Sequence, residues 1–132
     1  MSKKSQSSKT SSLTSQHIAE IAAEALDDMK GQSITSINVE KVTSITDVMV
    51  ICTGTSSTHI KALADEVTRN IKDAGGQVNG VEGKVQAEWV LVDLGGAVVH
   101  IMTAPVRALY NLEELWDFQP DESQSEETVE EN

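Results

Sequence analysis

One thiol and three imidazoles are the side chains of this 132-residue chain that could supply a nucleophile and its base. Cys52 would need a nearby base such as His59 or His100, together with a donor for the oxyanion. Cys52 lies in the continuous apolar run 48–52, where a free cysteine usually acts as a small hydrophobe. Packing is therefore the favoured interpretation. Zinc is disfavoured because one cysteine and scattered histidines lack the spacing of a structural site.

Four carboxylates, Asp47, Glu82, Glu88 and Asp93, are the candidates for a two-metal centre. Such a centre needs carboxylates that converge within a few ångströms. The spacing brings no more than one of them to any strand end, which favours turn residues and solvated charges. We expect no catalytic residue, no metal and no cofactor.

Residues 54–58, Gly-Thr-Ser-Ser-Thr, join a predicted strand to a predicted helix. Free N–H groups at a helix start can hold an anion, so this loop could bind a phosphate or a nucleotide. A turn with a serine cap is the favoured interpretation, because caps are common. The sequence has neither a Gly-Lys-Ser/Thr phosphate-binding loop nor the three-glycine dinucleotide-binding fingerprint. A nucleotide-binding transferase-like protein that uses this loop stays open as an alternative.

The charge balance is strongly acidic, with 10 Lys and Arg against 21 Asp and Glu, a net charge of −11. Broad binding to phosphates needs a basic face, so direct nucleic-acid recognition is not expected. No apolar run reaches the roughly 18 residues of a membrane helix, so no membrane partner is expected either. A single cysteine is typical of a reducing compartment, and the expected location is the cytoplasm.

The composition predicts one domain over residues 14–118 between two disordered tails. Residues 1–13 are a Ser- and Lys-rich tail and residues 119–132 an acidic one, and both are poor in side chains that could be buried. Two helical stripes of apolar residues are expected, one from a cap at Thr14 or Ser15 to Gly31, the other over 60–74. Strands are expected at 37–39, 48–52, 77–81, 88–94 and 97–103, with a short helix after Pro105 and a last helical turn at 112–116.

These elements predict an α/β fold, a mixed five-stranded sheet with flanking helices in two or three layers. The strand at 48–52, the helix after it and the strand at 77–81 favour a parallel crossover. The two strands that follow should form a hairpin around Gly95 and Gly96.

The register of that hairpin predicts a mixed face and an aliphatic face. If Leu94 opposes Ala97, one face carries a large aromatic, a carboxylate and an imidazole, and the other only aliphatic residues. The mixed face would hold Trp89, Leu91, Asp93, His100 and Met102, and the aliphatic face Val90, Val92, Val99 and Ile101. A mixed face of this kind is typical of a binding surface or a polar site. His100 and Asp93 are diagonal neighbours on it, near enough for a hydrogen bond to be considered.

Trp89 and Tyr110 are two of only four aromatic residues in the chain. Tryptophan and tyrosine are over-represented among the residues that carry binding energy at protein interfaces. Core packing is an equally good interpretation from these residues alone.

Five short segments form a combined pattern, at 47–57, 80–83, 88–95, 98–100 and 107–116. The last one reads Arg-x-x-Tyr-x-Leu-Glu-x-Leu-Trp and is the most specific. In this order and at these separations, the segments resemble the Iojap family, whose bacterial members are ribosomal silencing factors. The resemblance covers about residues 15–116.

The resemblance implies a translational repressor that is not an enzyme. It implies binding to the large ribosomal subunit through ribosomal protein fourteen, which sterically blocks association with the small subunit under nutrient limitation. It also implies a nucleotidyltransferase-like fold and a possible homodimer away from the ribosome. Because Iojap-like proteins also occur in organelles, an organellar ribosome assembly factor stays open as an alternative.

The resemblance also assigns residues to a partner-binding surface. Trp89 and Tyr110 match the aromatic contact residues of the family. The polar positions that match are Glu82, Asp93, His100 and Arg107. These four would either bind the partner or hold the surface in shape.

Overall fold

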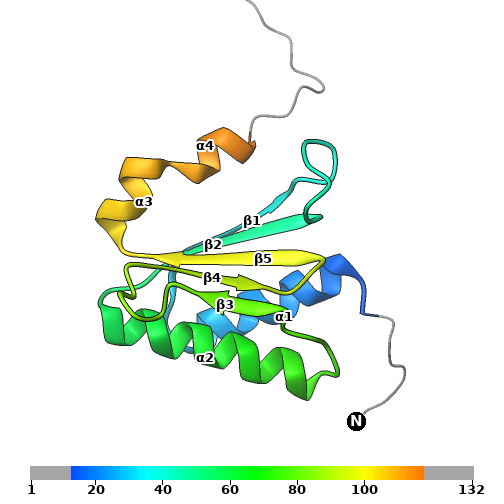
Figure 1. Cartoon of the computed structure of the whole chain (residues 1–132), viewed down its shortest axis with the longest axis horizontal. Coiled ribbons are helices and arrows are strands. Elements are labelled where there is room, and N and C mark those ends of the chain that lie inside the picture. The colour runs from blue at the N-terminus through cyan, green and yellow to red at the C-terminus, as the bar shows by residue number, and fades with distance from the viewer. Residues whose placement is uncertain (1–12, 118–132) are drawn as a thin grey trace, which may run out of the picture.

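The computed structural model describes residues 13–117, in which five strands and four helices form an α/β domain (Figure 1). The predicted tails at 1–13 and 119–132 lie outside the described residues, Leu13 excepted. The elements in chain order are α1 (Ser15–Asp28), β1 (Gln32–Asn38), β2 (Val48–Thr53), α2 (Ser57–Asp73), β3 (Gly80–Glu82), β4 (Trp89–Asp93), β5 (Ala97–Met102), α3 (Ala104–Tyr110) and α4 (Leu112–Asp117).

The strands form one mixed sheet in the order β1-β2-β5-β4-β3, which confirms the expected five-stranded mixed sheet. β2 and β5 are parallel, and every other neighbouring pair is antiparallel. β3 therefore runs in the same direction as β2, as the predicted crossover requires, but it lies at the far edge of the sheet. The parallel neighbour of β2 is β5, because the β4–β5 hairpin lies between β2 and β3.

Two helices cover one face of the sheet, and the two short helices lie on the other (Figure 1). The buried apolar residues of α1 and α2 pack with the aliphatic face of the β4–β5 hairpin in one core cluster. A smaller cluster on the opposite face includes Met49, Ile51 and Met102, and Val106 and Leu112 pack against it. Every residue of β2 is buried, which confirms the prediction of a strand covered on both faces.

The end of α1 differs from the expected glycine cap. The helix ends at a C-cap on Met29, and Lys30, not Gly31, has the left-handed backbone conformation, with a φ of 65°. Position 31 needs a glycine because there is no room for a side chain. A Cβ there would lie 2.5 Å from the Cys52 sulfur and 2.9 Å from the Leu26 carbonyl oxygen. Similarly, β3 begins at Gly80, not at residue 77, although the Asn79 N–H already donates to the Asp93 carbonyl at 2.7 Å.

Cys52 lies in the main core and is fully buried beneath the two long helices. Burial raises the pKa of its thiol to about 11, so the group is neutral at physiological pH. Its sulfur donates only to the Thr53 carbonyl oxygen, at 3.6 Å, while His59 and His100 bond elsewhere. The structure thus supports the packing interpretation of this cysteine.

The buried thiol leads to a prediction about its reactivity. In the native protein, Cys52 should react with an aromatic disulfide reagent at pH 8 at least about 100-fold more slowly than in 6 M urea, because only the exposed thiolate attacks. The measurement is the release of the coloured thiolate with time. A free cysteine-containing peptide is the control, and native labelling at the rate of that peptide would contradict the buried position.

Candidate functional site

The β4–β5 hairpin has the predicted register. Trp89 lies opposite Met102, Leu91 opposite His100 and Asp93 opposite Val98. Because side chains alternate along a strand, the mixed face predicted from the sequence is present on the side of the sheet that bears α3 and α4. Glu82 of the edge strand pairs with Leu91, so it belongs to the same face.

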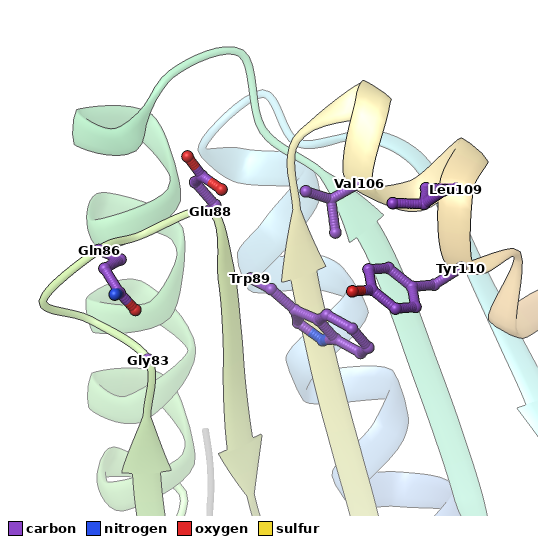
Figure 2. A pocket seen from close by; sticks show the side chains of 7 residues that line it. All are labelled: Gly83, Gln86, Glu88, Trp89, Val106, Leu109 and Tyr110. Carbon is purple, nitrogen blue, oxygen red and sulfur yellow. The ribbon is translucent and has the colours of Figure 1, made fainter.

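Helix α3 brings the second predicted aromatic residue to this face. Its N-cap, Thr103, accepts from the Val106 N–H, and a proline lies in the first turn. The helix ends at Asn111, which is left-handed with a φ of 48°, so Tyr110 lies at its last turn. The Tyr110 and Trp89 rings pack at a tilt of 49° with centroids 4.9 Å apart, and Tyr110 keeps 55% of its surface exposed (Figure 2).

His100 supports Trp89 from within the sheet. The indole Nε1–H donates to His100 Nδ1 at 3.0 Å, and the ring centroids are 5.9 Å apart. His100 is only 8% exposed, and burial lowers the pKa of its imidazole to about 4. The ring is therefore neutral at pH 7 and carries its proton on Nε2, since Nδ1 accepts.

The diagonal pair predicted from the register does not form a hydrogen bond. Asp93 and His100 share a face, as the register requires, but Asp93 Oδ1 accepts from the Gly95 N–H at 2.9 Å and closes the hairpin turn. His100 Nδ1 instead accepts a hydrogen bond from the indole N–H of Trp89. Both residues thus hold the local structure of the mixed face.

Arg107 connects the two short helices to β1 and β2. Its guanidinium forms a two-point ion pair with Glu113, with distances of 2.8 and 2.7 Å. The same group donates to the hydroxyls of Thr53 at 2.9 Å and Thr35 at 3.3 Å. Hydrogen bonding from Arg107 holds the pKa of Glu113 below its usual range. This network holds α3 and α4 against β1 and β2.

A hollow of about 410 Å³ opens between the loop 83–88 and α3, and we call it the aromatic hollow (Figure 2). It is lined by Gly83, Gln86, Glu88, Trp89, Val106, Leu109 and Tyr110. The sequence reasoning identified the two aromatic residues but missed Gln86, Val106 and Leu109 and treated Glu88 as a solvated charge. The spacing of residues 106, 109 and 110 could have indicated Val106 and Leu109, because residues three and four apart share one face of a helix.

The loop 54–58 forms the serine cap that was favoured from the sequence. Ser56 Oγ accepts from the His59 N–H at 3.0 Å. His59 Nδ1 accepts from the Thr55 N–H at 2.9 Å, and its Nε2–H donates to the Met29 carbonyl at 2.8 Å. The imidazole of His59 therefore accepts from the Thr55 N–H, a backbone donor that a bound anion would need.

Two further observations concern residues 13–117 only. Nowhere in that range do three or more histidine, cysteine or acidic side chains come together as a metal site would require. No helix there is long and apolar enough to cross a membrane.

Solved structures with the same fold come from two bacteria. A crystal structure of a protein from Chromobacterium violaceum superposes with a TM-score of 0.76 at 42% identity, covering 83% of this chain and 91% of that one. A crystal structure from Bacillus halodurans gives a TM-score of 0.69 at 37% identity and covers 76% and 94% of the two chains. The fold is thus one shared by bacterial proteins of this size.

Sequence comparisons identify the family. The family model described as "Ribosomal silencing factor during starvation" matches residues 12–132. A ribosomal silencing factor RsfS of Haemophilus influenzae is 48% identical over 75% of this chain and 97% of its own length. A Bacillus subtilis protein of the same name is 40% identical over 78% and 87%. The chain belongs to the family of ribosomal silencing factors, which supports a ribosome-associated silencing role.

The Arg107 network predicts a specific stability loss. Arg107→Lys should lower the free energy of unfolding by about 1–2 kcal/mol, because an ammonium group cannot make the planar two-point contact and reach both threonines. Urea unfolding at pH 7 measures the change. Arg69→Lys is the matched control, since Arg69 pairs with Glu66 on the surface of α2. Equal stability losses in the two variants would contradict the proposed importance of the network.

The neutral, buried His100 predicts a dependence of stability on pH. The pKa is about 4 in the folded protein against 6.5 for a free imidazole, so below pH 6.5 the unfolded chain binds a proton that the folded chain does not. Stability should fall as the pH falls from about 6.5 towards 4. By pH 5 the wild type should lose about 2 kcal/mol more than His100→Gln, relative to pH 7. Parallel pH profiles in the urea unfolding of the two proteins would show that this histidine does not titrate as expected.

Proposed function

We propose that this protein is a translational repressor that binds the large ribosomal subunit through ribosomal protein fourteen. Bound there, it sterically prevents association with the small subunit when nutrients are limiting, and it acts in the cytoplasm without catalysing a reaction. The observation that carries the proposal is the packed pair of half-buried Trp89 and exposed Tyr110, held in a defined geometry in a chain of the silencing-factor family. Repression of this kind requires only occupancy and excluded volume.

The pair of half-buried Trp89 and exposed Tyr110 has the properties of an interface centre. Aromatic residues often contribute 2 kcal/mol or more each to protein binding when they lie in a desolvated patch. A stable interface buries about 800 Å² on each partner, which one face of a domain of this size can provide. The net charge of −11 would also increase the rate of association with a basic ribosomal protein.

The polar residues of the proposed surface have two roles. Glu82 and Asp93 belong to the mixed face and are proposed to contact the partner. His100 and Arg107 are proposed to act through their neighbours, since His100 fixes the indole of Trp89 and Arg107 holds α3 against the sheet. On this proposal the aromatic contact surface is preformed before binding.

Two features of the proposal concern the wider family. A mouse protein named "Mitochondrial assembly of ribosomal large subunit protein 1" is 33% identical over 64% of this chain and 39% of its own length. That name favours ribosome assembly in an organelle as the alternative, but the bacterial relatives match more of the chain and of their own length.

We also propose a nucleotidyltransferase-type origin for the mixed sheet and a homodimer away from the ribosome.

Binding to purified ribosomal particles tests the proposal. Wild-type protein should sediment with isolated large subunits and reduce their joining to small subunits. Tyr110→Ala should weaken large-subunit binding by at least about tenfold, because it removes an exposed interface aromatic worth more than 1.4 kcal/mol. Trp89→Ala should have a similar effect.

Ile45→Ala is the control, because Ile45 is another exposed apolar residue, at 81%, and lies in the β1–β2 loop. The sharper variant is Tyr110→Ala, because its largely exposed side chain contributes little to folding. Wild-type binding by folded Tyr110→Ala and Trp89→Ala proteins would exclude the aromatic pair as the binding site. Unchanged subunit joining in the presence of bound wild-type protein would exclude the silencing mechanism.

A further inference from the structure

The aromatic hollow has an apolar side that is open to solvent. Trp89, Val106, Leu109 and Tyr110 form this side, and Leu109 keeps 75% of its surface exposed (Figure 2). A large exposed apolar patch in a monomer usually marks a binding surface. A small-molecule site buries most of its ligand, roughly 70–90%, which a hollow with so many exposed lining residues cannot do. The geometry favours a side chain presented by another protein, because the rest of that protein would cover the open side of the hollow.

The charge at the rim of the hollow is negative. Glu88 lines the hollow, and its carboxylate forms no hydrogen bond or ion pair with any described residue. The one basic residue of the loop 83–88 and the one basic residue of α3, in contrast, are both paired. Lys84 pairs with Asp65 at 2.6 Å, and Arg107 pairs with Glu113. The free charge beside the apolar surface therefore belongs to a carboxylate, which attracts a lysine or arginine and repels a phosphate.

The loop that bears Glu88 is held in place by its backbone. Gly83 has a φ of +91°, and a Cβ there would lie 2.3 Å from the Trp89 carbonyl oxygen. Ala87 is buried with a φ of 54°, and its N–H donates to the Gly83 carbonyl at 2.9 Å. The Thr103 N–H donates to the Glu88 carbonyl at 3.0 Å. Because α3 is held by Arg107, both sides of the hollow are formed before a partner arrives, which lowers the entropic cost of binding.

We propose that the aromatic hollow receives one apolar side chain from a basic protein surface, and that a lysine or arginine of that surface pairs with Glu88. The inference rests on the proposed function and specifies the chemistry of the partner at this site. It adds Leu109 and Glu88 to the residues that contact the partner. It also states that the hollow binds a protein and not ribosomal RNA.

Binding of single variants to isolated large subunits tests the inference. Leu109→Ser should raise the dissociation constant by about tenfold, because it replaces an exposed apolar contact residue with a small polar side chain. Glu88→Lys should raise it by at least about tenfold through repulsion of the basic partner. Glu88→Gln should reduce the salt dependence of the association rate, because it removes an exposed attractive charge.

Matched controls lie on the β1–β2 loop, which is far from α3 (Figure 1). Ile45→Ser makes the same kind of change at an exposed apolar residue, and Glu40→Lys makes the same charge change at an exposed glutamate. Both controls should bind within about twofold of the wild type, as surface changes outside an interface usually do. Circular dichroism and urea unfolding of each variant confirm that it is folded.

The outcomes separate this inference from the proposed function. If the wild type binds and Tyr110→Ala does not, while Leu109→Ser and Glu88→Lys match their controls, the hollow is not the contact and the inference fails alone. Tighter binding by Glu88→Lys would place ribosomal RNA there and overturn it. A loss of self-association in Leu109→Ser without a loss of ribosome binding would assign the hollow to a second copy and overturn it too. Failure of the wild type to bind large subunits would overturn the proposed function and the inference with it.

Discussion

The antiparallel pairing of β4 and β5 is the constraint on which the two faces of this protein depend. With Leu91 opposite His100, the four residues of the aliphatic face lie toward the two long helices, and the residues of the mixed face lie on the other side of the sheet. A shift of one residue would exchange the two sets, placing a carboxylate and an imidazole in the main core. Burial of the aliphatic set therefore selects the register, and the register in turn assembles the mixed face.

Two polar contacts convert the mixed face into a defined surface. The hydrogen bond to His100 fixes the orientation of the Trp89 indole, and α3 has no buried residue of its own to hold it on the sheet. The guanidinium of Arg107 supplies that attachment through Glu113, Thr35 and Thr53. A short, mostly exposed helix is thus positioned by directional bonds, with the small apolar cluster beneath it.

The cysteine and two of the three histidines of the described domain have structural roles. Cys52 is buried and neutral, His59 holds the start of α2 to the end of α1, and His100 accepts from an indole. Around the aromatic hollow, Tyr110, Leu109 and Glu88 are exposed beside the half-buried Trp89. Such a surface is suited to binding a partner, which is all that the proposed repression by occupancy needs.

The sequence by itself determined the α/β class, the number of strands, the hairpin register and the two-sided burial of β2, because each follows from local periodicity and turn residues. It misplaced the first strand, which was expected at 37–39 and runs over Gln32–Asn38, because this edge strand has only weak alternation of apolar and polar residues. It also indicated Trp89 and Tyr110 through the ordered family pattern. Only the tertiary structure decided that β5 lies between β2 and β4, that Lys30 ends α1, that His100 bonds Trp89 instead of Asp93, and that residues 83–88 meet α3 around a hollow. These features depend on contacts between segments distant in sequence, and neither the spacing of apolar residues nor a short motif encodes such distances.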